Sequence, residues 1–156
     1  CRLLARAAGA QGMAGGQAID LASVGKPLSE TELRGMHERK TGALLQASVR
    51  MGAACGSAVT PAARAALDDF GAVIGLAFQV VDDILDVTAD SAELGKTAGK
   101  DAAADKPTYV SLLGLPAAQA LADALCSQAH AALEASGLPG VERLRALADL
   151  VVKRRN

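Results

Sequence analysis

The segment GLAFQVVDDILDV, residues 75–87, constrains the fold most, because it places three aspartates inside an otherwise apolar stretch. Successive residues of a helix are about 100° apart, so Gln79, Asp82, Asp83 and Asp86 fall within an arc of roughly 100°. The rest of the circumference is apolar, which is typical of a helix buried on most sides. An unpaired buried carboxylate is very unfavourable, so the acidic face must meet either water or a cation.

Composition supports a bundle of such helices. The chain has 156 residues, enough for one domain with a core. Apolar residues make up 51% of the chain and aromatic residues only 2%, with no tryptophan, which favours packed helices over sheets. No segment shows the alternating pattern of a strand, so the expected fold class is all-α.

Charge and cysteine content exclude several classes of function. A net charge of −1 gives no overall field that would attract nucleic acid or a membrane surface. No apolar run could span a bilayer and no signal peptide is present, so we expect a cytoplasmic protein without stable membrane insertion. Cys1, Cys55 and Cys126 lie far apart, which argues against a disulfide framework or a zinc site. Cys55 and Cys126 are interpreted as small core residues, and His37 and His130 lack partners at ligand or triad spacing.

Start and stop signals divide the chain into helices. Ser29 and Glu32 form a capping box, and Thr60 followed by Pro61 is a second helix start. The glycines of the first segment predict close helix packing. The expected helices cover about residues 1–24, 29–54, 61–87, 107–114, 116–136 and 140–154, with a polar loop over residues 88–107.

Two interpretations of the acidic face remain open. Like charges four residues apart repel, as Asp82 and Asp86 would, so a cavity that holds cations would stabilise them. Hard oxygen ligands without histidine or cysteine suit Mg²⁺. The alternative is an aspartate-rich face at the edge of the bundle with no ligand, since acidic helical faces are common.

The loop after the acidic helix adds basic residues. LGKTAGKDAAADKP, residues 94–107, places Lys96, Lys100 and Lys106 together with Asp101 just beyond the acidic helix. Carboxylates that bind Mg²⁺ and nearby lysines make a diphosphate site. A solvated loop of mixed charge is the alternative.

Lys40 and Thr41 interrupt the apolar face of HERKTGALLQASVRMGA, residues 37–53. A lone lysine at such a position normally extends its ammonium group into water. Its position alone therefore leaves open both a solvated lysine and a phosphate ligand.

Four ordered motifs together resemble the trans-isoprenyl diphosphate synthase family: GMAGGQAIDL, HERKTGALLQASVRMGA, FQVVDDILD and LGKTAGKDAAADKPTY. The pattern is most similar to bacterial short-chain enzymes of the farnesyl diphosphate synthase (geranyltranstransferase) type, and geranylgeranyl diphosphate synthases share much of it. The resemblance implies the isoprenoid-synthase helical bundle around a deep central cavity, usually as a homodimer.

The same resemblance implies a reaction. An allylic diphosphate, dimethylallyl or geranyl, ionises to a carbocation, isopentenyl diphosphate attacks it, and loss of a proton completes the extension. Up to three Mg²⁺ ions, for which Mn²⁺ is a possible substitute, hold the allylic diphosphate.

Roles for individual residues also follow from the resemblance. Asp82 matches a direct metal ligand. The residues that would act on metal through bound waters are Asp83, Asp86 and Asp101. The lysines that would hold the departing diphosphate are Lys40, Lys96 and Lys106. The groups beside the developing cation would be Thr41, Gln79 and the Lys40 carbonyl, braced by Gln17 and Asp20.

The chain departs from the family in one respect, because no first aspartate-rich motif is found and the upstream basic residues are missing. Asp68 and Asp69 lack the context of that motif and are interpreted as a solvated face. We therefore expect residues 1–156 to be the C-terminal half of one synthase domain, inactive alone. The alternatives are a non-catalytic subunit of a related synthase and a terpene cyclase, against which the intact acidic and lysine motifs argue.

Overall fold

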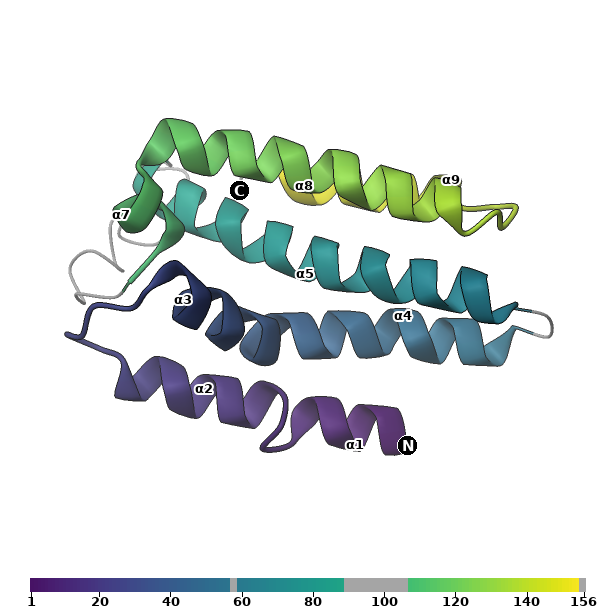
Figure 1. The fold of residues 1–156 in the computed structure, drawn as a ribbon, viewed down its shortest axis with the longest axis horizontal. Helices are drawn as coiled ribbons and strands as arrows, with labels where there is room; N and C mark the ends of the chain where they lie inside the picture. The colour runs from purple at the N-terminus through teal and green to yellow at the C-terminus, as the bar shows by residue number, and fades with distance from the viewer. Residues whose placement is uncertain (57–58, 89–106, 155–156) are drawn as a thin grey trace.

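The computed structural model describes residues 1–56, 59–88 and 107–154. Every regular element within these ranges is helical (Figure 1), which confirms the all-α prediction for this part of the chain. The elements are α1 (Arg2–Ala8), α2 (Met13–Ala22), α3 (Glu30–His37), the π-helix η1 (Glu38–Gly42), α4 (Ala43–Cys55), α5 (Pro61–Thr88), α7 (Tyr109–Leu113), α8 (Leu115–Ala135) and α9 (Glu142–Lys153).

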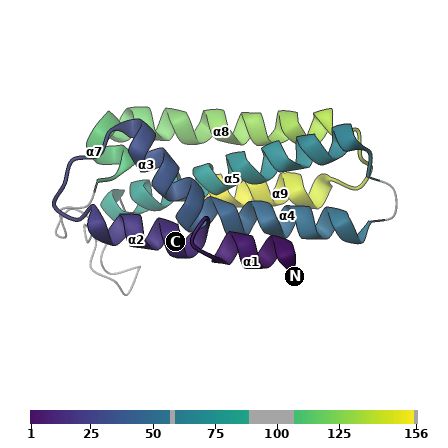
Figure 2. The same ribbon diagram turned by 60° about the horizontal axis from the view of Figure 1, so that its bottom comes forward.

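Helix α5 runs through the centre of the bundle, as its largely apolar circumference predicts. In Figure 1 it lies between α4 and α8, and α1 and α2 form an outer layer beside α4. Figure 2 brings α9 into view from behind α8, where it contacts both α5 and α8. Large side chains buried along these contacts include Phe70 and Val80 of α5 and Leu125 and Leu133 of α8.

The first segment differs from the single helix expected over residues 1–24. The structure breaks it into α1 and α2 at residues 9–12. At the break the chain folds back so closely that a Cβ on Gly12 would lie 2.0 Å from the Ala7 carbonyl oxygen. Only glycine fits there, so the glycine-rich composition produces a turn as well as close packing.

The segment over residues 29–54 starts as expected and then departs from a regular α-helix. Both hydrogen bonds of the Ser29–Glu32 capping box are present. The helix widens into the π-helix η1 over Glu38–Gly42 before continuing as α4. Nothing in the sequence pattern indicated this widening, and π-turns inside α-helices occur frequently at functional sites.

The remaining boundaries agree with the sequence. The Thr60 hydroxyl accepts a hydrogen bond from the Ala63 amide at 3.1 Å, which confirms the predicted start of α5. Helices α7, α8 and α9 fall inside or within a residue of their expected ranges. In the described parts of the chain, none of the helices is both long and apolar enough for a membrane crossing.

Candidate functional site

Two glycine contacts place the π-helix η1 against its neighbours. A Cβ on Gly16 of α2 would lie 2.2 Å from the Lys40 amide nitrogen. A Cβ on Gly75 of α5 would lie 2.8 Å from the Gly42 Cα. Both distances are shorter than real side chains tolerate, so α2, η1 and α5 are in backbone contact. This packing fixes Lys40 and Thr41 between the other two helices.

Lys40 and Thr41 each contact a residue that the sequence assigned to the same site. The Lys40 ammonium lies 2.6 Å from an oxygen of Asp20, whose side chain is only 8% exposed. The Thr41 hydroxyl donates a hydrogen bond to the Gln79 side-chain oxygen on α5. Gln17, one turn before Asp20 on α2, is half-buried.

The aspartates of α5 lie in different surroundings. Asp83 is buried, and its carboxylate accepts a hydrogen bond of 2.7 Å from the Tyr109 amide at the start of α7. Asp82 has a side chain 60% exposed, and Asp86 is half-buried. The predicted arc is present, but Gln79 faces η1 while Asp83 faces α7. The face is therefore divided among several neighbours within the described residues.

Arg154, immediately after α9, pairs with Asp82. Its guanidinium donates to an Asp82 oxygen at 3.2 Å and to the Phe78 carbonyl oxygen at 3.0 Å. The same group lies 3.9 Å from the centre of the Phe78 ring, a cation–π contact. Sequence analysis missed this residue, because no local pattern reports a contact between positions 72 residues apart.

His37 is buried beside this cluster, at the junction of α3 and η1. Its ring stacks on Tyr109 at 5.9 Å, and neither ring nitrogen has a hydrogen-bond partner among the described residues. Burial, reinforced by the charge of Lys40 and opposed by Asp20, lowers the pKa of His37 to about 4. Burial also raises the pKa of Tyr109 to about 12. Both rings are therefore uncharged at neutral pH.

The structure thus brings together four of the expected site residues in two contacting pairs, Lys40 with Asp20 and Thr41 with Gln79. The expected ligands Lys96, Asp101 and Lys106 lie outside the described residues, as does Lys100.

The interpretation of four other residues was wrong or incomplete. Cys55 is exposed at the end of α4, so it is no core residue. Cys126 is half-buried, and His130 does have partners at short range, Cys126 and Asp149. Asp68 forms an ion pair of 2.6 Å with Arg50, whereas Asp69 is exposed as expected.

The sequence profile of the family described as polyprenyl synthetase matches residues 2–136. A probable farnesyl diphosphate synthase from Bradyrhizobium diazoefficiens is 54% identical over 149 residues, covering 94% of this chain and 45% of the relative. Geranylgeranyl pyrophosphate synthase 7 from Arabidopsis thaliana is 45% identical over 156 residues, covering 98% of the chain and 45% of the relative.

Among solved structures, the chain is similar to the geranyltransferase of Helicobacter pylori, crystallised with magnesium and isoprenyl diphosphate. The two chains share 35% identity and a TM-score of 0.80, over 97% of this chain and 49% of the geranyltransferase. The helical arrangement is therefore that of the isoprenyl diphosphate synthase fold. The chain spans about half the length of the curated relatives it matches.

Proposed function

The chain belongs to the polyprenyl synthetase family, and we propose that it forms part of a prenyltransferase that joins an allylic diphosphate to isopentenyl diphosphate. The allylic substrate would be dimethylallyl or geranyl diphosphate, and the product farnesyl diphosphate. One observation carries the proposal. The π-helix holds Lys40 and Thr41 against Asp20 and Gln79, beside the acidic end of α5.

The donor set near Asp82 fits magnesium. It consists of carboxylate oxygens, which suit a hard cation such as Mg²⁺ or Mn²⁺. Asp82 is accessible to a ligand and already attracts a cationic group, the Arg154 guanidinium. We assign Asp82 as the direct ligand, with Asp86 and Asp101 acting through metal-bound waters. Asp83 is also proposed to act through a metal-bound water. Its hydrogen bond from the Tyr109 amide fixes the start of α7 as well.

When bound, the metal would stabilise negative charge on the departing diphosphate. Lys40 supplies further positive charge, and Asp20 holds its ammonium in place, with Gln17 beside it on α2. Lys96 and Lys106 complete the diphosphate site in the proposal. Fixed cations lower the barrier because they act where charge grows as the carbon–oxygen bond breaks.

Thr41 and Gln79 act on the other product of that cleavage, the allylic carbocation. Their oxygens, together with the Lys40 carbonyl, present dipoles without a strong nucleophile. The hydrogen bond between the two side chains fixes their orientation. The double bond of isopentenyl diphosphate then attacks the cation, and proton loss restores neutrality. An apolar cavity wall, as in the related synthases, would exclude water that would otherwise capture the cation.

Three further statements belong to the proposal. The exposed apolar side chains of α1 and α2, Leu4, Met13 and Leu21, support a homodimer that buries them. A geranylgeranyl product is the second candidate, favoured by the similarity to the Arabidopsis protein. The three free cysteines support a reducing, cytoplasmic location.

A chimera tests the chemistry directly. The chain would replace the matching 45% of the Bradyrhizobium relative, and the chimera would be assayed with Mg²⁺, geranyl diphosphate and isopentenyl diphosphate. We expect farnesyl diphosphate as product. Asp82→Ala in the chimera should lower turnover about a thousandfold or more, because a metal site for the leaving group is lost.

Asp69→Ala is the matched control, since Asp69 is an exposed aspartate on the same helix. The intact Bradyrhizobium protein controls for activity of the remaining half. Turnover of Asp82→Ala within tenfold of the unmutated chimera would refute the assigned role. A longer product would favour the geranylgeranyl candidate. No turnover, with a folded chimera and an active parent, would favour a non-catalytic subunit.

The chain by itself should give no elongated product, because it spans about half of its relatives. The purified 156-residue chain, incubated with Mg²⁺ and both substrates, checks this. Elongation at a rate near that of the chimera would show that one half suffices.

A further inference from the structure

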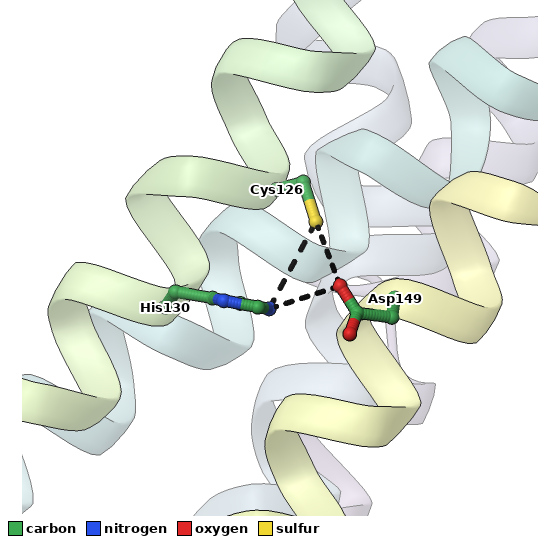
Figure 3. A group of neighbouring side chains, drawn as sticks. All are labelled: Cys126, His130 and Asp149. Carbon is green, nitrogen blue, oxygen red and sulfur yellow. Dashed lines mark hydrogen bonds and ion pairs between the residues drawn. The ribbon is translucent and has the colours of Figure 1, made fainter.

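Three side chains with different ligand atoms converge between α8 and α9, far along the sequence from the acidic face of α5. Figure 3 shows Cys126 and His130 projecting from α8 toward Asp149 of α9. The Cys126 sulfur lies 4.0 Å from His130 Nε2 and 3.6 Å from Asp149 Oδ1. His130 Nε2 lies 3.2 Å from the same carboxylate oxygen.

These separations are close to those of a tetrahedral metal site. Zinc bonds are about 2.3 Å long to sulfur and about 2.0 Å long to nitrogen or oxygen. In a tetrahedral site these lengths place the sulfur roughly 3.5 Å from each nitrogen or oxygen ligand atom. The nitrogen–oxygen pair would be roughly 3.3 Å apart. The largest departure is the sulfur–nitrogen distance, about 0.5 Å too long, which a small side-chain rotation corrects.

Helix geometry explains why the cluster forms. Residues four apart lie on one face of a helix, so Cys126 and His130 point the same way from α8. Contacts between α8 and α9 then bring Asp149 opposite them. All three residues are half-buried, so an ion could reach the cluster from solvent.

We propose that Cys126, His130 and Asp149 bind Zn²⁺ or a similar borderline transition-metal ion, with a fourth position left for water. Thiolate and imidazole ligands select such ions over Mg²⁺, which separates this site chemically from the carboxylates of α5. The bound ion connects α8 to α9 and so stabilises the packing of the two helices. Three protein ligands with an open position is also the arrangement of catalytic zinc sites.

Two features of the surroundings compete with an ion, and neither blocks the cluster. Burial and the neighbouring Asp149 raise the pKa of the Cys126 thiol, so a metal must displace a proton to bind and its affinity should rise with pH. The Lys153 ammonium lies 3.8 Å from Asp149 Oδ1, where it would compete with an ion. Its side chain is 75% exposed, so it can turn into solvent without losing packing.

Cobalt provides a spectroscopic test, because Co²⁺ replaces Zn²⁺ and reports its ligands. Titrating the reduced protein with Co²⁺ should give one equivalent of a four-coordinate ion with a sulfur-to-cobalt charge-transfer band. Zn²⁺ should displace it and raise the Tm, since a ligand that binds the native state stabilises it. Cys126→Ser, His130→Ala and Asp149→Asn should each weaken binding roughly a hundredfold or more.

Cys55→Ser is the matched control, because Cys55 is a free, exposed cysteine on another helix. Asp82→Asn controls for metal at the carboxylates of α5. Both variants should retain the band. A six-coordinate spectrum without sulfur, or a band lost in Cys55→Ser and kept in Cys126→Ser, would overturn the proposal. If Co²⁺ binding were undiminished in both His130→Ala and Asp149→Asn, the proposal would be wrong, and the cluster would be only an ion pair between α8 and α9.

Discussion

Two of the basic side chains that pair with carboxylates in this molecule, Lys40 and Arg154, are held in different ways. Lys40 sits on the π-helix, where backbone contacts with α2 and α5 fix its position before any charge is considered. Its partner Asp20 is 8% exposed. Arg154 follows the last helix and is placed by contacts of its own side chain with Phe78 and Asp82. Its partner Asp82 is 60% exposed.

Lys40 is thus a cation held in one place, whereas the contact of Arg154 with Asp82 can be exchanged for another ligand. Reorienting Lys40 would remove an ion pair from a buried carboxylate, which costs more than separating an exposed pair. Water or a metal can replace Arg154 at Asp82, because that carboxylate is exposed, while the Arg154 side chain, only 18% exposed, stays packed on Phe78. Lys40 is therefore suited to act as preorganised charge, whereas Arg154 pairs with the carboxylate that we propose as the direct metal ligand.

Gly16→Ala should have the largest effect on this arrangement. The added methyl group would lie 2.2 Å from the Lys40 amide nitrogen and 2.5 Å from its Cα, so backbone must move. We expect the free energy of unfolding to fall by about 3 kcal/mol, at the upper end of overpacking costs. Urea unfolding followed by circular dichroism measures it.

Gly52→Ala is the matched control, because Gly52 lies within α4 and a Cβ there would meet no atom within 4 Å. It should be neutral or stabilise the protein by up to about 1 kcal/mol, since alanine favours the helix. Equal losses in both variants would show that the contact between α2 and η1 is not the cause.

Acidification should lower the free energy of unfolding through His37, which is buried at the junction of α3 and η1. Its pKa is about 4 in the folded protein and about 6.5 when unfolded, so the unfolded state binds more protons between these values. The contribution of His37 is fully present above about pH 6.5 and is lost as pH falls through 4. This difference in pKa between the folded and unfolded states corresponds to a loss of at most about 3 kcal/mol in the free energy of unfolding.

His37→Phe tests this assignment, since the ring can still stack on Tyr109 and no longer titrates. Unfolding free energies measured from pH 7 to pH 4 should fall more steeply in wild type than in the variant. Identical slopes would show that carboxylates, and not His37, account for the acid sensitivity.

Sequence patterns predicted those parts of the fold that local chemistry decides. The capping box at Ser29 and the N-cap at Thr60 fixed two helix starts, and the apolar circumference placed α5 in the centre. The break at Gly12 was missed, because glycine content indicates permissiveness without specifying where the chain turns. The π-helix was missed because it spans only five residues, too few to show a period of its own.

The candidate site was predictable where a motif places residues on one helix. The arc of Gln79, Asp82 and Asp83 follows from helical spacing, but their separate neighbours depend on how α7, η1 and the chain end pack. The pair Cys126 and His130 is spaced four residues apart, a signal that sequence analysis could have used. Asp149 could not have been added, because it comes from a different helix.

Lys40→Met should destabilise the protein by about 2 kcal/mol, because the buried Asp20 carboxylate would lose its ion pair with the Lys40 ammonium. The double variant Lys40→Met with Asp20→Leu should recover part of this loss, since it also removes the buried charge. Urea unfolding of the three variants, including Asp20→Leu alone, gives the coupling energy. A coupling energy near zero would contradict the description of this pair as a fixed unit.

The ion pair between Arg154 and Asp82 should contribute least to stability, below about 1 kcal/mol in a double-mutant cycle of Arg154→Ala with Asp82→Ala, because Asp82 is largely exposed and salt screens the pair. Arg154→Ala also frees Asp82 for a metal, so in the chimera the Mg²⁺ concentration for half-maximal turnover should fall. Arg64→Ala is the control, since Arg64 is an exposed arginine near the opposite end of α5. If the coupling energy of Arg154 with Asp82 instead matched that of Lys40 with Asp20, and Arg154→Ala left the Mg²⁺ requirement unchanged, both cations would be structural. The distinction between a fixed and an exchangeable cation would then fail.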